Sequence, residues 1–212
     1  MLGWCRALQR TQGWGAVSDA DVAEGVRLAR QALEGARDDP DTMWQAAMPL
    51  SLFAGETAMA MAVVDRALTL NPNAAAAWMA RGFLHALSNH PEASIEAIDR
   101  AQRLSPFDPL DFWSAVSVAI AHLAARRFEE AIEWAERALH SQPRLATALR
   151  VKIVANAHLG RLDEARAELG RMLAMDPGLT IPRYRMFLGL QTAPEVFELL
   201  VTGLRLAGLP EG

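Results

Sequence analysis

Apolar residues recur along this chain at the spacing of helices that bury one side. Between Ala75 and Leu87, the residues Met79, Phe83, Ala86 and Leu87 follow one another at intervals of four, three and one. This spacing places them on one side of a helix. Alanine and leucine dominate the hydrophobic residues, while the strand-favouring types are sparse, a bias that favours helix over strand. The pattern predicts an all-α chain.

Four prolines give this helical pattern a period. Pro72, Pro106, Pro143 and Pro177 are separated by 34, 37 and 34 residues. Each proline closes a helical segment, because proline cannot continue the helical hydrogen bonds and disfavours a helical residue before it. A fixed period of this length indicates an array of similar helix pairs.

The repeated unit resembles the tetratricopeptide repeat, whose period is 34 residues. That family carries an aromatic residue in the first helix, small residues where the two helices cross, and a closing proline. Met48 and Ile153 stand where the family usually has glycine, so we expect those two pairs to cross less closely. Each set below gives the aromatic position, the glycine position and the two small positions of one unit. They are Trp78, Gly82, Ser94 and Ala101 in the unit closed by Pro106; Trp44, Met48, Ala60 and Ala67 before Pro72; Ala115, Ala119, Ala131 and Ala138 before Pro143; and Leu149, Ile153, Ala165 and Met172 before Pro177.

The resemblance implies one domain over residues 1–212, a right-handed superhelical solenoid of about five helix–turn–helix units with a C-terminal capping helix. Three extra residues near Pro109 to Asp111 are expected to lengthen the first helix of their unit. The second helix of the first unit is expected at about Asp19 to Ala36. The units are an irregular first one at 1–40, repeats at about 41–74, 75–108, 109–145 and 146–179, and a cap at 180–212.

The two ends of the chain differ in pattern. After Pro177 we expect an irregular stretch through Arg183 and Arg185, and then a helix opened by Pro194 with an apolar stripe. The N-terminus begins without a leading polar helix, and from this we infer that something preceded it or that this face docks on a partner. The stripe residues are Val196, Leu199, Leu200 and Leu204, and the apolar N-terminal residues are Leu2, Trp4, Ala7 and Leu8.

Family geometry puts one side of each first helix in a concave groove. The residues there are mostly apolar, which suits an amphipathic helix or a hydrophobic peptide. The middle of the groove has Met, Phe, Trp and Val where the carboxylate-clamp members of the family use Lys, Arg and Asn. The alternative is that the chain's own C-terminal segment, or close packing, fills the groove. The expected groove residues are Met79, Phe83, Leu87, Trp113, Val116, Ile120, Leu123, Arg150, Val154 and His158.

Three segments resemble a narrower group, the C-terminal tetratricopeptide regions of bacterial class III adenylate cyclases and of related transcriptional regulators. They are the run from Trp4 through Trp14 to Leu33, the stretch from Ser105 to Trp113, and the ending from Gly203 to Gly212. This resemblance implies an alternative function as a regulatory tail separated from its output domain. No catalytic residue carries over, because the cyclase active site belongs to a separate upstream domain.

Composition and motifs narrow the chemistry. The formal net charge is -4 and no basic stripe is present, so we expect no nucleic-acid binding by this chain. There is no glycine-rich phosphate loop and no metalloprotease or hydrolase motif. Cys5 is the only cysteine, which argues against a structural zinc site. We therefore expect no enzyme, no catalytic or metal-binding residue and no cofactor.

Targeting signals are not recognisable either. Met1 to Gly15 lacks the layout of a signal peptide, and the longest apolar run, Ala115 to Ala125, is short of the roughly 20 residues of a membrane helix. These features favour a cytoplasmic protein. The expected partner is a protein or peptide, a missing N-terminal domain, or a second copy in a homodimer.

Overall fold

The computed structural model describes Cys5, Gln9 and residues 18–35, 38–188 and 192–212, and within these ranges it contains helices and no strand. The predicted all-α solenoid is therefore confirmed. The helices are α2 (Asp19–Gly35), α3 (Pro40–Ala54), α4 (Thr57–Leu70), α5 (Ala75–Leu87), α6 (Pro91–Leu104), α7 (Asp111–Ala124), α8 (Phe128–Ser141), α9 (Ala146–His158), α10 (Leu162–Met175), α11 (Ile181–Leu188) and α12 (Pro194–Ala207).

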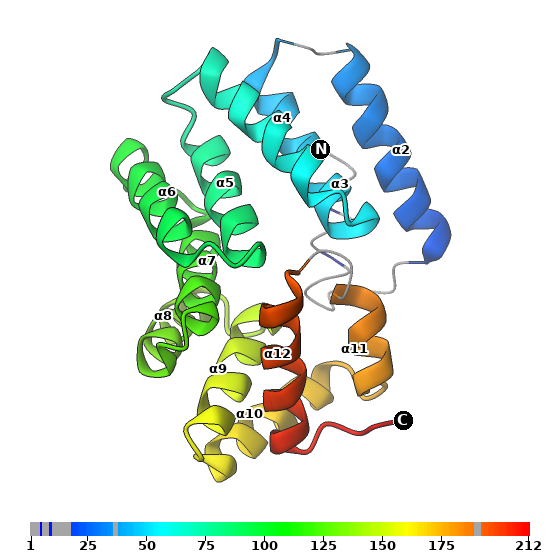
Figure 1. Ribbon diagram of the computed structural model, residues 1–212, viewed down its shortest axis with the longest axis vertical. Coiled ribbons are helices and arrows are strands. Elements are labelled where there is room, and N and C mark those ends of the chain that lie inside the picture. Colours follow the sequence, from blue (N-terminus) through cyan, green and yellow to red (C-terminus); the bar gives the residue numbers. More distant parts are fainter. Residues whose placement is uncertain (1–4, 6–8, 10–17, 36–37, 189–191) are drawn as a thin grey trace.

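The helices follow one another around a C-shaped arc (Figure 1). Each first helix packs on its own second helix and on the first helix of the next pair, so that α3, α5, α7 and α9 form a continuous inner layer. The second helices α4, α6, α8 and α10 have no comparable contacts with one another. The concave side is therefore built from the first helices, and the second helices form the convex side.

We propose that the structure divides into the units predicted from the sequence. The pairs α3–α4, α5–α6, α7–α8 and α9–α10 fall in turn into the four predicted repeat intervals, to within one residue at Pro40. Lys152 ties three helices of the last two units together. Its Nζ donates to Glu168 Oε1 at 2.9 Å and lies 3.1 Å from Glu136 Oε1.

The predicted crossing positions are buried, and the closest approach of two paired helices is at Gly82. At Gly82 an added Cβ would lie 2.7 Å from Ile98 Cδ1 and 3.1 Å from the Ser94 carbonyl oxygen. The backbones of α5 and α6 thus approach so closely that only glycine fits there. The other buried crossing residues are Met48, Ala60, Ala67, Ser94, Ala101, Ala119, Ala131, Ala138, Ile153, Ala165 and Met172.

Helix α2 begins where the sequence predicts. The Ser18 backbone N–H and hydroxyl both donate to Asp21 Oδ2, at 3.0 and 2.8 Å, and the Asp21 N–H donates back to Ser18 Oγ at 3.2 Å. This reciprocal cap satisfies donors that the first helical turn leaves free. The apolar N-terminal residues Leu2, Trp4, Ala7 and Leu8 lie outside the described part of the chain.

Two local predictions are wrong. The stretch through Arg183 and Arg185 is helix α11, because Ile181 and Tyr184 are buried on one side of it and the Ile181 N–H donates to the Pro210 carbonyl at 2.8 Å. A helix of eight residues depends on such tertiary contacts. The extra residues of the third repeat add little to its first helix. Helix α7 has 14 residues against 13 in α5 and α9, so most of the insertion lies in the connection around Phe107.

Substituting Gly82 with alanine tests the close crossing of α5 and α6. The added Cβ must displace Ile98, and we expect a loss of about 1–3 kcal/mol in the free energy of unfolding. Gly170, in α10, is the matched control because a Cβ there meets nothing within 4 Å. Gly170→Ala should instead gain roughly 0.5–1 kcal/mol from helix propensity. Equal effects of the two substitutions in urea unfolding would contradict the close crossing.

Candidate functional site

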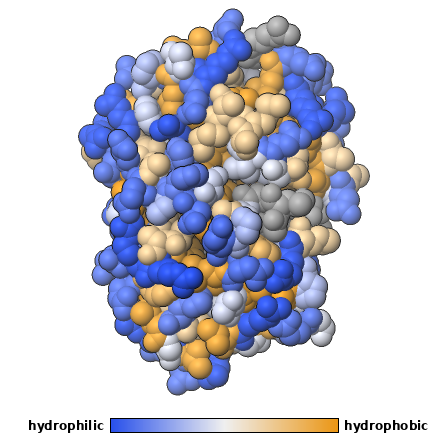
Figure 2. All heavy atoms as spheres, viewed as in Figure 1, coloured by the Kyte–Doolittle hydropathy of each residue, from blue (hydrophilic) through white to orange (hydrophobic). Residues whose placement is uncertain are grey.

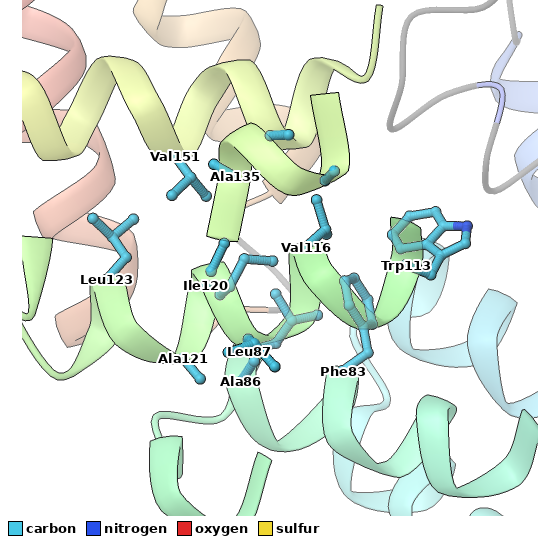
Figure 3. Packing of buried hydrophobic residues seen from close by; sticks show 14 of the residues in the cluster. Phe83, Ala86, Leu87, Trp113, Val116, Ile120, Ala121, Leu123, Ala135 and Val151 are labelled. Carbon is cyan, nitrogen blue, oxygen red and sulfur yellow. The ribbon is translucent and has the colours of Figure 1, made fainter. Parts of the chain in front are cut away.

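The inner side of the solenoid is the candidate site, and it is closely packed. Of the ten residues predicted to line it, all except Arg150 and His158 are at most 7% exposed. Phe83 of α5 lies edge-on against Trp113 of α7, with ring centroids 5.4 Å apart (Figure 3). Figure 3 also shows Leu87 of α5 beside the apolar side of α7. These side chains join neighbouring repeats, as a solenoid core requires.

Helix α12 lies inside the arc, alongside α9 (Figure 1). At Gly203 an added Cβ would lie 2.7 Å from Val154 Cγ1 and 2.9 Å from Val154 Cα. The α12 backbone therefore rests directly on α9 at this point. His158 Nε2 is 3.0 Å from the Leu199 carbonyl oxygen, and the His158 ring stacks on Phe128 at 5.2 Å. The contact combines close packing with a polar interaction.

The chain on either side of the 189–191 gap also contacts the predicted groove residues. The Ala193 N–H donates to the Leu87 carbonyl at 2.8 Å, so the segment before α12 crosses the end of α5. The Arg150 guanidinium lies 5.2 Å from the centre of the Tyr184 ring in α11. Leu87, Arg150, Val154 and His158 thus contact the C-terminal segment. Over this part of the concave side, the chain's own C-terminus occupies the groove.

Helix α12 is strongly amphipathic. Its buried side carries Val196, Leu200 and Leu204, which belong to the stripe predicted from the sequence, whereas Glu198 and Arg205 face solvent. Glu198 is paired with Arg185 at 3.2 Å and Arg205 with Glu211 at 2.6 Å. On the molecular face in Figure 2, short hydrophobic patches alternate with hydrophilic ones. The apolar side of α12 is thus turned inward while its polar side stays wet.

The other part of the concave side is a small apolar cleft shared by α3, α5 and α7. Its volume is about 10 Å³, the room that roughly one water needs. The sequence prediction included Met79, Phe83 and Trp113 in the groove but gave Trp44 and Met48 as the aromatic and glycine positions of their repeat. Aromatic and methionine residues suit both sides, so no sequence signal separated them. The cleft is lined by Trp44, Met48, Met79, Ala80, Phe83, Trp113 and Ser117.

Other kinds of site have little structural support. Among the residues that the structure describes, no three His, Cys, Asp or Glu side chains are grouped so that they could hold a metal ion. No helix in that part of the chain has the length and apolar character needed to cross a membrane. Burial is the main cause that lowers the pKa of His85 and of His122, so both imidazoles favour their neutral form.

Comparison with known proteins identifies relatives of this arrangement. A family model described as tetratricopeptide repeat matches residues 51–109 and 119–179. The type IV pilus biogenesis factor PilW is 17% identical with a TM-score of 0.64, and the match covers 96% of this chain and 90% of that one. A thermophilic TPR protein in Thermus thermophilus is 15% identical with a TM-score of 0.64, covering 88% of this chain and 98% of that one.

A third structure, the TPR protein YrrB, is described as having an unusual peptide-binding site. It is 19% identical with a TM-score of 0.50, covering 84% of this chain and 91% of that one. No curated protein matches the chain. At these identities the structural likeness concerns the fold alone.

Tyr184 offers a test of how tightly the C-terminal segment closes the site. Its ring stacks on Phe197 of α12 at 6.2 Å, and its hydroxyl has no hydrogen-bond partner among the described residues. Burial raises the pKa of Tyr184 from 10.0 to about 12, while the Arg150 charge acts in the opposite direction. Above pH 10.0 the unfolded chain ionises first, so stability is complete below this pH and falls as pH rises toward 12.

We expect this residue alone to cost up to about 3 kcal/mol of unfolding free energy by pH 12. Because Tyr184 is the only tyrosine, the ultraviolet absorbance of tyrosinate reports its ionisation directly. Tyr184→Phe is the control and should lack this part of the alkaline stability loss. A tyrosinate titration near pH 10 in the folded protein would mean that the C-terminal segment does not seal the ring.

Proposed function

This chain belongs to the tetratricopeptide repeat family, and on that premise we propose that it is a protein–protein interaction scaffold whose concave groove binds an amphipathic helix. Members of the family generally mediate contacts with proteins or peptides. The observation that supports the proposal is the packing of α12 on α9. An amphipathic helix with an apolar stripe of Val196, Leu200 and Leu204 already lies on α9, which is the chemistry that the groove accepts.

The external ligand in this proposal competes with α12. The Gly203–Val154 contact and the 3.0 Å contact of His158 with the Leu199 carbonyl show how α12 is held. A competing helix would therefore need an apolar stripe and a small residue at the point where it approaches α9 most closely. Because α12 is tethered to the groove, its effective concentration there is on the order of millimolar. A partner helix must therefore bind strongly, or α12 must be loosened first, before the groove becomes available.

The apolar cleft extends the proposed site toward α3. Its walls are aromatic and methionine side chains, of which methionine adapts readily to different partners. The Phe83–Trp113 pair spans two repeats, so a ligand side chain inserted there would contact both. In this proposal one large apolar side chain of the ligand inserts into the cleft. The cleft must then widen beyond the volume it has in this structure.

A second candidate function is a regulatory tail of a nucleotide cyclase or a transcriptional regulator. What supports it is the sequence resemblance at Trp4 to Leu33, Ser105 to Trp113 and Gly203 to Gly212. The last of these segments contains the final residues of α12 and the buried Leu209 that follows it, so the resemblance includes the end of the helix that lies on α9. Mapping the native translation start and reading the DNA frame upstream of Met1 would distinguish a regulatory tail from a stand-alone scaffold.

Gly203→Val in the full chain tests groove binding. The larger side chain cannot fit against Val154, so α12 should detach from α9 while the repeats remain folded. A fluorescent peptide of residues 192–212 should then bind the variant at least roughly tenfold more tightly than the wild type, whose groove is occupied in cis. Fluorescence anisotropy measures the binding, and circular dichroism and hydrogen exchange report the repeats and α12 separately.

The matched controls are the same peptide carrying Gly203→Val and a protein carrying Gly170→Ala. The altered peptide should not bind the opened groove, and the altered protein should behave as the wild type. If hydrogen exchange shows α12 released but the wild-type peptide still fails to bind, the groove does not accept an amphipathic helix and the proposal is wrong.

A further inference from the structure

One position near the end of the first helix is polar in all four repeats. It lies 21 residues before each closing proline, and its residues are Ser51, His85, His122 and Asn156. Ser51 and Asn156 are buried, with 0% and 5% of their surface exposed, and the two histidines are partly buried. Of these four side chains, only the histidines change charge near neutral pH.

The histidine rings are enclosed without hydrogen-bond partners. Among the described residues, neither Nδ1 nor Nε2 of His85 has a partner, and both atoms are shielded from solvent. The same is true of Nδ1 of His122. A protonated imidazole carries an N–H donor on each nitrogen, and burying a charge with unpaired donors is costly. Both rings therefore fit the fold as neutral groups and fit it poorly as cations.

Charges near His85 disfavour its protonated form. Arg81 lies one helical turn earlier in α5, and the ring of His90, the residue before α6, stands edge-on to the His85 ring with centroids 5.7 Å apart. Burial is the largest cause that lowers the pKa of His85, and the charges of Arg81 and His90 add to it. Asp65 of α4 acts in the opposite direction, but its carboxylate is already paired with Arg81 at 2.8 Å. A proton on His85 would therefore add a positive charge beside Arg81.

His122 has more carboxylates around it. Burial is again the largest cause that lowers its pKa, followed by the charge of Arg127, which is itself paired with Glu92 of α6 at 3.0 Å. The carboxylates that act in the opposite direction are those of Glu130, Glu92 and Glu133. His85, with one such carboxylate, is the more sensitive of the two histidines to acid.

His85 also lies where the C-terminal segment crosses the repeats. Its carbonyl accepts the N–H groups of Ser88 and His90, at 3.2 and 2.9 Å, and these bonds close α5. Two residues later the Leu87 carbonyl accepts the Ala193 N–H at 2.8 Å. Both carbonyls belong to the last turn of α5. A His85 ring that moves outward to reach water would therefore disturb the acceptor that holds Ala193.

We propose that protonation of His85 loosens the last turn of α5 and releases the C-terminal segment from Leu87, so that acid opens the concave groove. Since the folded chain disfavours the proton, the stabilisation from neutral His85 is present above pH 6.5, the ordinary histidine value, and is lost as pH falls below it. The release itself is independent of the proposed function, whereas the use of the opened groove rests on it.

The other histidine near α12 does not act in this way. His158 Nε2 is 3.0 Å from the Leu199 carbonyl oxygen. An imidazole can donate from Nε2 in its neutral form and in its charged form alike, so this contact persists when His158 takes up a proton. The acid response is therefore assigned to the end of α5 and not to the contact between α9 and α12.

Hydrogen exchange at the Ala193 amide tests the release in the full chain. Between about pH 7.5 and about pH 5.5, its protection should fall at least roughly fivefold after correction for the intrinsic pH dependence of exchange. His85→Asn, which copies the residue type of the equivalent position in the last repeat, should abolish this fall. His140→Asn alters an exposed histidine of α8 and should leave the fall as in the wild type.

Amides of α9 show whether the response is local, because they should keep their protection in acid. The proposal is overturned if Ala193 keeps its protection at the lower pH, or if the fall persists in His85→Asn. A loss of protection in α9 equal to that at Ala193 would mean general unfolding and would also overturn it.

Binding of the fluorescent peptide of residues 192–212 separates this inference from the proposed function. The wild-type chain should bind the peptide at least roughly fivefold more tightly at about pH 5.5 than at about pH 7.5, and His85→Asn should show no such gain. If Ala193 loses protection in acid and the peptide still fails to bind, the acid release stands and groove binding is wrong.

Discussion

The apolar inner layer of first helices is the constraint on which this structure depends. A single helix pair cannot cover the apolar side of its first helix, so each repeat relies on the next one for burial. The Phe83–Trp113 contact between α5 and α7 is one such junction. The approach of paired helices is set by small residues, most closely at Gly82, and this spacing lets the first helices stack into one curved layer.

The same constraint explains the course of the C-terminal segment. The inner layer curves, so its concave side would expose Val154, Leu87 and their neighbours to water if nothing covered it. After α11 the chain turns back, and α12 packs on α9. There Gly203 permits direct backbone contact with Val154. A covering helix of this kind has the same chemistry as a ligand. Occupation in cis would therefore make any binding by the groove conditional on the position of α12.

The exposed residues of the convex side differ in charge between the repeats. On α6, α8 and α10 the exposed positions carry charges, which keep a surface hydrated. On α4 the corresponding positions carry Ala58, Met59 and Ala62, so the first part of the solenoid has an apolar surface outside as well as inside.

The sequence by itself determined the period, the helical class and the crossing residues, because proline stops helices and glycine permits close approach through local chemistry. It also identified the amphipathic stripe of α12. Only the tertiary structure decided which surface that stripe covers, since periodicity tells which side is buried but not what buries it. In the same way α11 was read as irregular, because its eight residues are helical only through the packing of Ile181 and Tyr184. Trp44 and Met48 line the cleft for a similar reason, as the relative rotation of stacked repeats is set by the whole array and not by any one unit.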